Sequence, residues 1–203
     1  MNFFHSKKTQ KSNRARTSQR PLFLSPPFID ASLVDGSFKK IVVLPKYVDE
    51  DEWLAVNVLV QSECLPLRFF ALFKNNYEPY IWTDQNQKKN TKLPAPTYID
   101  YVMTWVQNLV NDENVFPTKA GREFPREFSV IVRSIFKQCF RVFAHIYYQH
   151  YEQILHLREE KQFNSLFAHF ISFAKEFNLL PDKKELAPLE ELITYMENNG
   201  RIS

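Results

Sequence analysis

The side chains best suited to specific chemistry lie in the segment Phe140–His150, which reads FRVFAHIYYQH. As a helix, this segment would be aromatic and apolar on most sides, yet it keeps two histidines, His145 and His150. Polar side chains on a buried helix normally have a specific partner, because burial without one costs free energy. The H-x4-H spacing suits a zinc site. The alternative is a pair of core histidines that are hydrogen-bonded to backbone or tyrosine groups.

A row of basic residues precedes and enters the same segment. Arg133, Lys137 and Arg141 recur every four residues, so the row turns by about 40° around the helix at each step. Guanidinium and ammonium groups bind anions through charge-assisted hydrogen bonds, which arginine can make in bidentate form. The row therefore predicts a site for an anionic group such as phosphate, or else an ordinary solvated or ion-paired helix face.

An acidic cluster stands directly before the first strongly apolar run. It consists of Asp49, Glu50, Asp51 and Glu52, and Trp53 follows it. Acidic side chains stabilise a helix N-terminus by about 0.3–1 kcal/mol each, because they oppose the positive end of the helix dipole. The cluster therefore predicts that a helix begins here, and its charge is also available to a partner protein.

Hydrophobic spacing predicts the helices that position these groups. The expected fold class is mainly α: a helical-bundle core with a small β-hairpin on its side and an extended N-terminal segment. The first of the predicted helices starts at the acidic cluster, and the others span roughly 97–112, 126–157, 164–180 and 188–198. In the longest of them, seven side chains are expected to point inward: Phe128, Val132, Ile135, Phe136, Cys139, Phe143 and Ile146.

The remaining segments carry weaker signals. The run Ile41–Leu44 resembles a short strand, and the stretches 80–82 and 91–93 predict the two strands of the hairpin. Residues 60–76 follow no clear period, and Pro66 is expected to interrupt helical continuation there. Thr97 is expected to cap the helix over 97–112, and Asn164–Ser165 are expected to begin the helix over 164–180.

Composition excludes several enzyme classes. The chain of 203 residues contains 3 glycines and has no glycine-rich phosphate-binding loop and no G-x-S-x-G nucleophile motif. Such loops need glycine because the backbone must approach the ligand closely. A hydrolase or transferase that uses His145, His150 or His156 is a remaining alternative, but the sequence shows no nucleophile with a base and an orienting group.

Charge divides the chain at about residue 20. Residues 1–20 hold six Lys or Arg and no acid, whereas the remainder has 20 basic and 23 acidic residues. We expect a disordered basic leader over 1–20 and one folded domain over 21–203. A nucleic-acid or membrane-surface role for the leader is the alternative, which salt-dependent binding of the truncated protein would test. Two cysteines and no membrane-spanning or secretory segment predict an intracellular protein.

Several long segments resemble the Mob family of kinase co-activators. They are KYVDEDEWLAVN (46–57), LPAPTYIDYVMTWVQNLVNDENVFPTKAG (93–121), FRVFAHIYYQH (140–150) and FNSLFAHFISFAKEFNLL (163–180). Two further segments, over 20–49 and 188–200, resemble the fungal Mob-two branch. Residues 58–76 are divergent and shortened, since the chain is about a dozen residues shorter than the family pattern between Asn57 and Trp82.

The resemblance implies a four-helix bundle without catalytic activity. Proteins of this family bind the N-terminal regulatory segment of NDR/LATS-type protein kinases, and the Mob-two branch acts in polarised growth and morphogenesis. The implied location is the cytoplasm, with the nucleus and the cell cortex or division site as further places. The acidic cluster Asp49–Glu52 with Trp53 becomes the expected kinase-binding site. Nucleic acid and a membrane are not expected partners, and impaired kinase binding through the shortened segment is an alternative.

The resemblance also bears on the anion and metal sites. In the Mob-one branch, which acts in mitotic exit and septation, a basic patch binds phosphorylated peptides; Lys137 and Arg141 fall on its positions, but Gln138 replaces a further basic residue. Many members hold a structural zinc with two cysteines and two histidines. His145 and His150 match the two histidines of that site. Cys64 is the one cysteine of this chain that lies near the positions of the family's cysteine pair. The zinc set is therefore incomplete, and no cofactor is the expectation.

Overall fold

The computed structural model describes residues 20–69, 79–83, 90–119, 121–180 and 182–202, with side chains described outside residues 61–91. The predicted leader lies outside this part of the chain except for its last residue, Arg20, whose guanidinium group forms an ion pair with Glu191. Within the described residues, no helix has both the length and the apolar character that crossing a bilayer requires.

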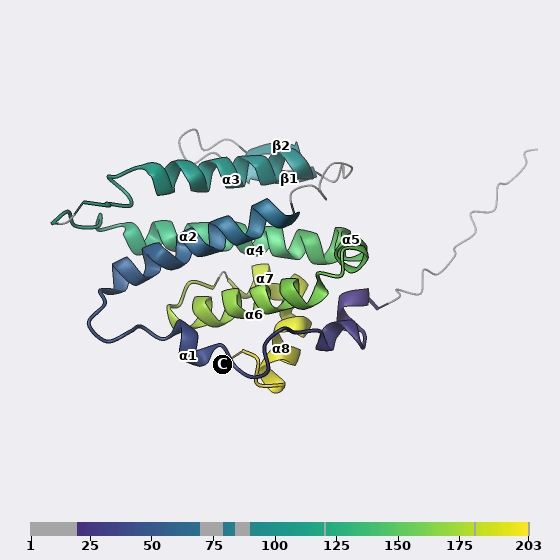
Figure 1. Cartoon of the computed structure of the whole chain (residues 1–203). Coiled ribbons are helices and arrows are strands. Elements are labelled where there is room, and N and C mark those ends of the chain that lie inside the picture. Colours follow the sequence, from purple (N-terminus) through teal and green to yellow (C-terminus); the bar gives the residue numbers. More distant parts are fainter. Residues whose placement is uncertain (1–19, 70–78, 84–89, 120, 181, 203) are drawn as a thin grey trace, which may run out of the picture.

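Four long helices form the core, as the predicted mainly α class requires. They are α2 (Glu50–Phe69), α3 (Ala95–Asn111), α4 (Phe128–Gln149) and α6 (Glu160–Glu176). Helix α4 lies in the middle: it contacts α2 and α3 on one side and α6 through aromatic rings on the other (Figure 1). Because α4 is covered on opposite sides, most of its surface is buried.

Shorter elements complete the bundle. At the N-terminal end they are η1 (Leu22–Leu24), η2 (Phe28–Asp30) and α1 (Lys39–Val42); after α4 they are α5 (Tyr151–His156), α7 (Lys183–Leu186), η4 (Ala187–Leu189) and α8 (Glu190–Asn198). The N-terminal elements run along the lower side of the bundle, where α1 contacts α6, and α8 packs against α6 from below (Figure 1).

The predicted hairpin is confirmed. Strands β1 (Pro79–Thr83) and β2 (Asn90–Pro94) pair antiparallel, with Tyr80 opposite Leu93 and Trp82 opposite Thr91. Both strands contact α3, which follows β2 without a break. The hairpin therefore sits at the N-terminal end of α3 rather than in the bundle core.

The core itself is aromatic. Phe136 stacks on Phe170 with ring centroids 4.9 Å apart, and Phe143 contacts the rings of Phe163, Phe167 and Phe170. All seven side chains of α4 that were expected to point inward are buried. The hydrophobic period of this segment therefore predicted its core face correctly.

The predicted helix over 126–157 is wrong in one respect, because it breaks at His150 into α4 and α5. His150 has φ −132° and ψ 10°, outside the helical region. The change of direction brings α5 against η1 and α6, where Tyr151 and Ile154 are buried. Hydrophobic period alone did not reveal this break, since the apolar pattern continues across it.

Two predicted helix starts are also wrong. Helix α3 begins at Ala95 with Pro94 as its N-cap and has no side-chain cap, so Thr97 lies inside it. Pro96 stands in the first turn, which proline suits because the N–H groups there have no partner within the helix. Helix α6 begins at Glu160, four residues before Asn164. Asn164 and Ser165 are buried and bind the backbone of residues 28–33 instead.

Two further predictions about local structure fail. Residues 39–42 form helix α1 rather than a strand, because Phe38 and Val42, four residues apart, are both buried while Ile41 is exposed. Helix α2 continues through Pro66 to Phe69. A proline inside a helix costs about 3 kcal/mol, and packing of α2 against both α3 and α4 offsets this cost.

Candidate functional site

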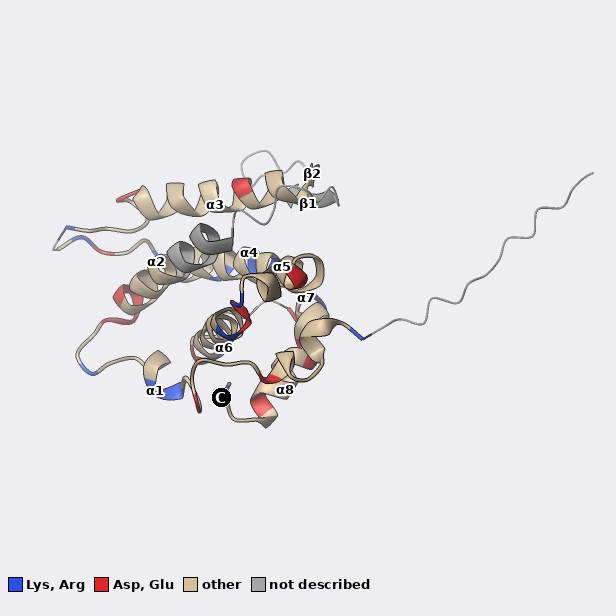
Figure 2. Ribbon diagram, turned by 45° about the vertical axis from the view of Figure 1, so that its right-hand side comes forward, with Lys and Arg blue, Asp and Glu red and all other residues tan. Residues whose placement is uncertain are grey.

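The acidic cluster forms the first turn of α2, as predicted (Figure 2). Asp49 caps the helix, since its Oδ1 accepts hydrogen bonds from the backbone N–H groups of Asp51 at 2.9 Å and Glu52 at 3.3 Å. A side-chain cap of this kind satisfies N–H groups that have no partner in the helix. Asp49 is therefore engaged within the chain, whereas Glu50 and Glu52 are exposed.

The acidic side chains of this turn repel one another. Partial burial raises the pKa of Asp51, and the neighbouring charges of Asp49 and Glu50 raise it further. Like charges on adjacent residues repel each other, so a cation placed at this turn would be attracted by all of them. The turn is therefore suited to a basic partner.

Apolar side chains adjoin this acidic turn. Tyr47 is fully exposed and has a positive φ of 71°, Val48 is 37% exposed, and Val56, in the second turn of α2, is 51% exposed. Trp53, by contrast, is half-buried, and its Nε1–H donates to the carbonyl of Val42 at 3.2 Å. Trp53 thus links α2 to α1, and the exposed apolar area belongs to its neighbours.

The basic row is only partly brought together. Lys137 and Arg141 share one carboxylate oxygen: Glu185 Oε1 lies 2.7 Å from Lys137 Nζ and 3.2 Å from Arg141 Nη2. Arg133 is exposed on the same helix and forms no ion pair with any acid among the described residues. Glu185 comes from α7, 44 residues beyond Arg141, so sequence spacing gave no signal for it.

A hydrogen-bond network holds Arg141 from its other side. Tyr98 of α3 donates to Gln138 Oε1 at 2.6 Å, and Arg141 Nη1 donates to the same oxygen at 3.5 Å. Burial opposes the charge on Arg141, but its interactions with Tyr98 and Glu185 leave its pKa raised. Gln138 Oε1 therefore accepts from both side chains and links Tyr98 of α3 to Arg141 of α4.

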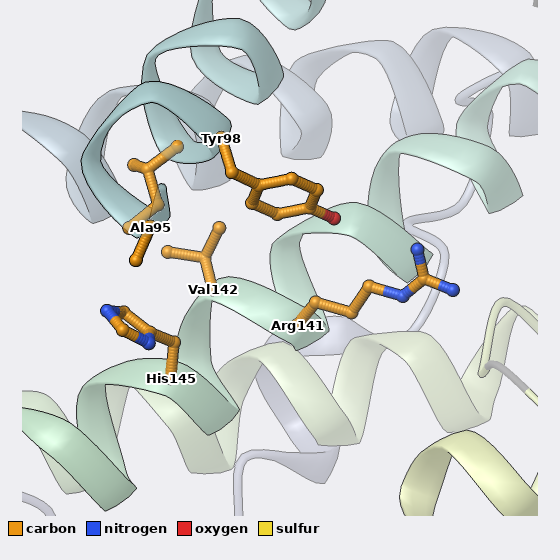
Figure 3. Close-up of a pocket in the computed structure, with 6 residues that line it drawn as sticks. Ala95, Tyr98, Arg141, Val142 and His145 are labelled. Atoms are coloured by element: carbon orange, nitrogen blue, oxygen red, sulfur yellow. The ribbon is translucent and has the colours of Figure 1, made fainter. Parts of the chain in front are cut away.

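The space between α3 and α4 beside this network is closed. Tyr98 of α3 and Arg141, Val142 and His145 of α4 line it, with the Tyr98 hydroxyl and the Arg141 guanidinium extending to the same side (Figure 3). It has no room for a water molecule. It is part of the packing between the helices and not a ligand site.

The two histidines meet in the core. His145 is 3% exposed and His150 4%, and their Nε2 atoms are 3.2 Å apart. Burial, and then the charge of its neighbour, lowers the pKa of His145 to about 4, and burial lowers the pKa of His150. Both rings are therefore neutral at pH 7, and one can donate a hydrogen bond to the other.

The same spacing suits two ligands of one zinc ion. Zinc–nitrogen bonds of 2.0–2.1 Å at a tetrahedral angle place two nitrogens about 3.3 Å apart. The side chains that the structure describes nevertheless form no group of three metal-binding residues. Cys139 is buried on α4 and Cys64 has its side chain outside the described residues. The described part of the chain thus supplies half of a tetrahedral set.

Comparison with known proteins identifies the class to which this fold and surface belong. The profile of the Mob1/phocein family matches residues 30–189. The chain therefore belongs to the Mob1/phocein family.

Its relatives point to one branch of that family. The chain is 48% identical to "Maintenance of ploidy protein mob2" of Schizosaccharomyces pombe, over 97% of this chain and 87% of that protein. It is 45% identical to "CBK1 kinase activator protein MOB2" of Saccharomyces cerevisiae, over 95% and 71% of the two chains. The protein of the same name from Candida albicans is 46% identical, over 90% of this chain and 62% of that protein. The resemblance to fungal Mob-two proteins is confirmed.

Proposed function

We propose that this protein is a non-catalytic co-activator that binds the N-terminal regulatory region of an NDR/LATS-family serine/threonine kinase. Family membership supports this, as do two relatives whose names describe them as activators of the CBK1 kinase. From the same resemblance we infer a role in polarised growth, morphogenesis and cell-cycle control.

The observation that carries the proposal is the exposed acidic first turn of α2 beside exposed apolar side chains. A basic helical segment of a kinase would pair its cations with Glu50 and Glu52 and bury apolar groups against Val48 and Val56. Charge pairs at the rim of such an interface set the approach rate and register, while apolar burial carries most of the affinity.

A charge reversal tests this proposal. We expect the double substitution Glu50→Lys/Glu52→Lys to weaken binding of an NDR-type kinase N-terminal segment by about tenfold or more at low salt, because attraction becomes repulsion. Fluorescence anisotropy with the labelled kinase segment measures the affinity.

The matched control makes the same change of charge at the N-terminal turns of two other helices. Glu152 and Glu190 are exposed acids in the first turns of α5 and α8, so Glu152→Lys/Glu190→Lys reproduces the effect on helix dipoles away from α2. Unchanged affinity in the α2 variant, or an equal loss in the control, would contradict the proposed binding surface. A wild-type protein that binds no such segment would favour impaired kinase binding through the divergent stretch 58–76.

A second candidate function is a phosphopeptide-binding scaffold of a mitotic-exit or septation pathway. It is favoured by the position of Lys137 and Arg141, whose partly exposed cationic groups converge on a single anionic oxygen 2.7 and 3.2 Å away. Two cations around one oxygen also suit a phosphoryl group. This site lies on α4 and is separate in sequence from the acidic turn of α2.

For the histidine pair, we propose a hydrogen-bonded role in the core without a bound zinc. Elemental analysis of the purified protein is expected to find less than one tightly held zinc per chain. The same measurement on His145→Asn provides the background level of adventitious metal. One zinc per wild-type chain that survives dialysis and is lost in the variant would overturn this proposal.

A further inference from the structure

The basic pair on α4 already has an anion within the chain. Glu185 Oε1 contacts both Lys137 Nζ and Arg141 Nη2, so one carboxylate oxygen stands where an external anionic oxygen would bind. The Lys137 and Arg141 side chains are still 37% and 36% exposed, and that of Glu185 is 24% exposed. The cations are therefore reachable from solvent while the carboxylate is bound.

Only one of the two carboxylate oxygens of Glu185 is bonded within the described residues. Its second oxygen, Oε2, is buried and accepts no hydrogen bond from any group among the described residues. A buried carboxylate oxygen without a donor costs free energy, which offsets part of the gain from the two ion pairs. The contact thus stabilises α7 less than a fully bonded carboxylate would.

The element that carries Glu185 is short. Helix α7 comprises four residues, Lys183–Leu186, and none of them is buried. Leu186 is its one side chain that packs against the hydrophobic core, and it is only partly buried. A short segment with so little buried apolar surface opens at low free-energy cost. Its displacement would leave both cations on α4, with Arg141 still in contact with Gln138 Oε1.

We propose that Glu185 is an internal competitor that occupies the anion site of Lys137 and Arg141 until a phosphorylated peptide displaces it. This rests on the second candidate function given above and adds its regulation. A phosphoryl group carries more negative charge than a carboxylate and offers three acceptor oxygens. It can therefore offer each cation an oxygen of its own, whereas Glu185 contacts both cations through one oxygen.

Fluorescence anisotropy on the full-length chain tests the competition. The probe is a labelled peptide with one phosphothreonine among glycine, serine and alanine, and its unphosphorylated form is the blank. We expect Glu185→Gln to bind the phosphopeptide about tenfold more tightly than wild type, since the competing charge is removed while size is kept. Glu190 is an exposed acid five residues further along the chain. The substitution Glu190→Gln, which removes its charge, is expected to leave the affinity nearly unchanged.

Two further variants test whether the gain in phosphopeptide affinity arises from the charge of Glu185 and from binding to Arg141. Glu185→Asp keeps the charge but shortens the side chain, so its affinity should fall between wild type and Glu185→Gln; it also serves if the glutamine variant folds poorly. Adding Arg141→Ala to Glu185→Gln should abolish the gain. Equal affinities of wild type and Glu185→Gln, or no phosphopeptide binding by either, would overturn the proposal.

This test is separable from the kinase proposal. Glu185→Gln leaves the acidic turn of α2 intact, so the kinase N-terminal segment should bind it as it binds wild type. If the kinase segment binds both and the phosphopeptide binds neither, the co-activator function stands and the competitor role of Glu185 fails.

Discussion

Replacing Asn164 by alanine is expected to lower the free energy of unfolding by about 3–4 kcal/mol, because a buried side chain loses three hydrogen bonds at once. Asn164 Nδ2 donates to the carbonyls of Phe28 and Ala31, both at 2.9 Å, and its Oδ1 accepts from the Tyr147 hydroxyl at 3.0 Å. Only 1% of the residue is exposed, so water cannot replace these bonds in the folded state.

The consequence should extend beyond α6. The carbonyls of Phe28 and Ala31 belong to η2 and the residue after it, so Asn164 ties the N-terminal segment to the bundle. Asn164→Asp separates the contributions: the carboxylate can still accept from Tyr147, but it cannot donate to the two carbonyls. We expect it to be at least as destabilising as alanine, since it also buries a charge.

Urea denaturation followed by circular dichroism measures the change, with the slope of the transition compared between variants. Asn198→Ala is the control, because Asn198 is exposed at the end of α8. A loss below about 1 kcal/mol in Asn164→Ala would show that the N-terminal segment is held by other contacts.

Phe143→Ala should cost about 3–5 kcal/mol, the range for large-to-small substitutions of buried aromatic residues. Phe143 is 0% exposed. The centroid of its ring lies 5.6, 5.2 and 5.0 Å from the ring centroids of Phe163, Phe167 and Phe170. Removing it opens a cavity among these three rings in the α4–α6 contact, which they cannot fill without leaving their rotamers.

The matched control lies on the same helix. Val130 of α4 is 61% exposed, so Val130→Ala should change the free energy of unfolding by less than about 0.5 kcal/mol. Phe143→Leu should fall between the two, since leucine keeps much of the buried volume. Equal stabilities of Phe143→Ala and Val130→Ala would contradict the assignment of the α4–α6 interface as the core.

The two predictions also bear on function. Helix α4 carries the buried Phe143 on its core side and the partly exposed Lys137 and Arg141 away from it. A core that holds this helix in one position keeps the two cations at a constant spacing. The binding surfaces therefore depend on packing that does not itself contact a partner.

The sequence by itself determined the elements whose signals are local. The apolar period of α4 predicted seven of its eleven buried residues. The short runs 80–82 and 91–93 around a polar stretch predicted the hairpin, and the acids at 49–52 predicted the start of α2. These signals work because helix and strand hydrogen bonds connect residues close in sequence. Long matching segments also established the family, which the profile over residues 30–189 confirmed.

Only the tertiary structure decided which polar groups meet. Glu185 lies 44 residues from Arg141, and Asn164 lies 136 residues from Phe28, so no spacing in the sequence pairs them. The same holds for the break at His150 and for helix α1, where burial against other elements overrode the local pattern. Side-chain hydrogen bonds and ion pairs act over a few ångströms, and the packing of the helices alone brings distant residues within that range.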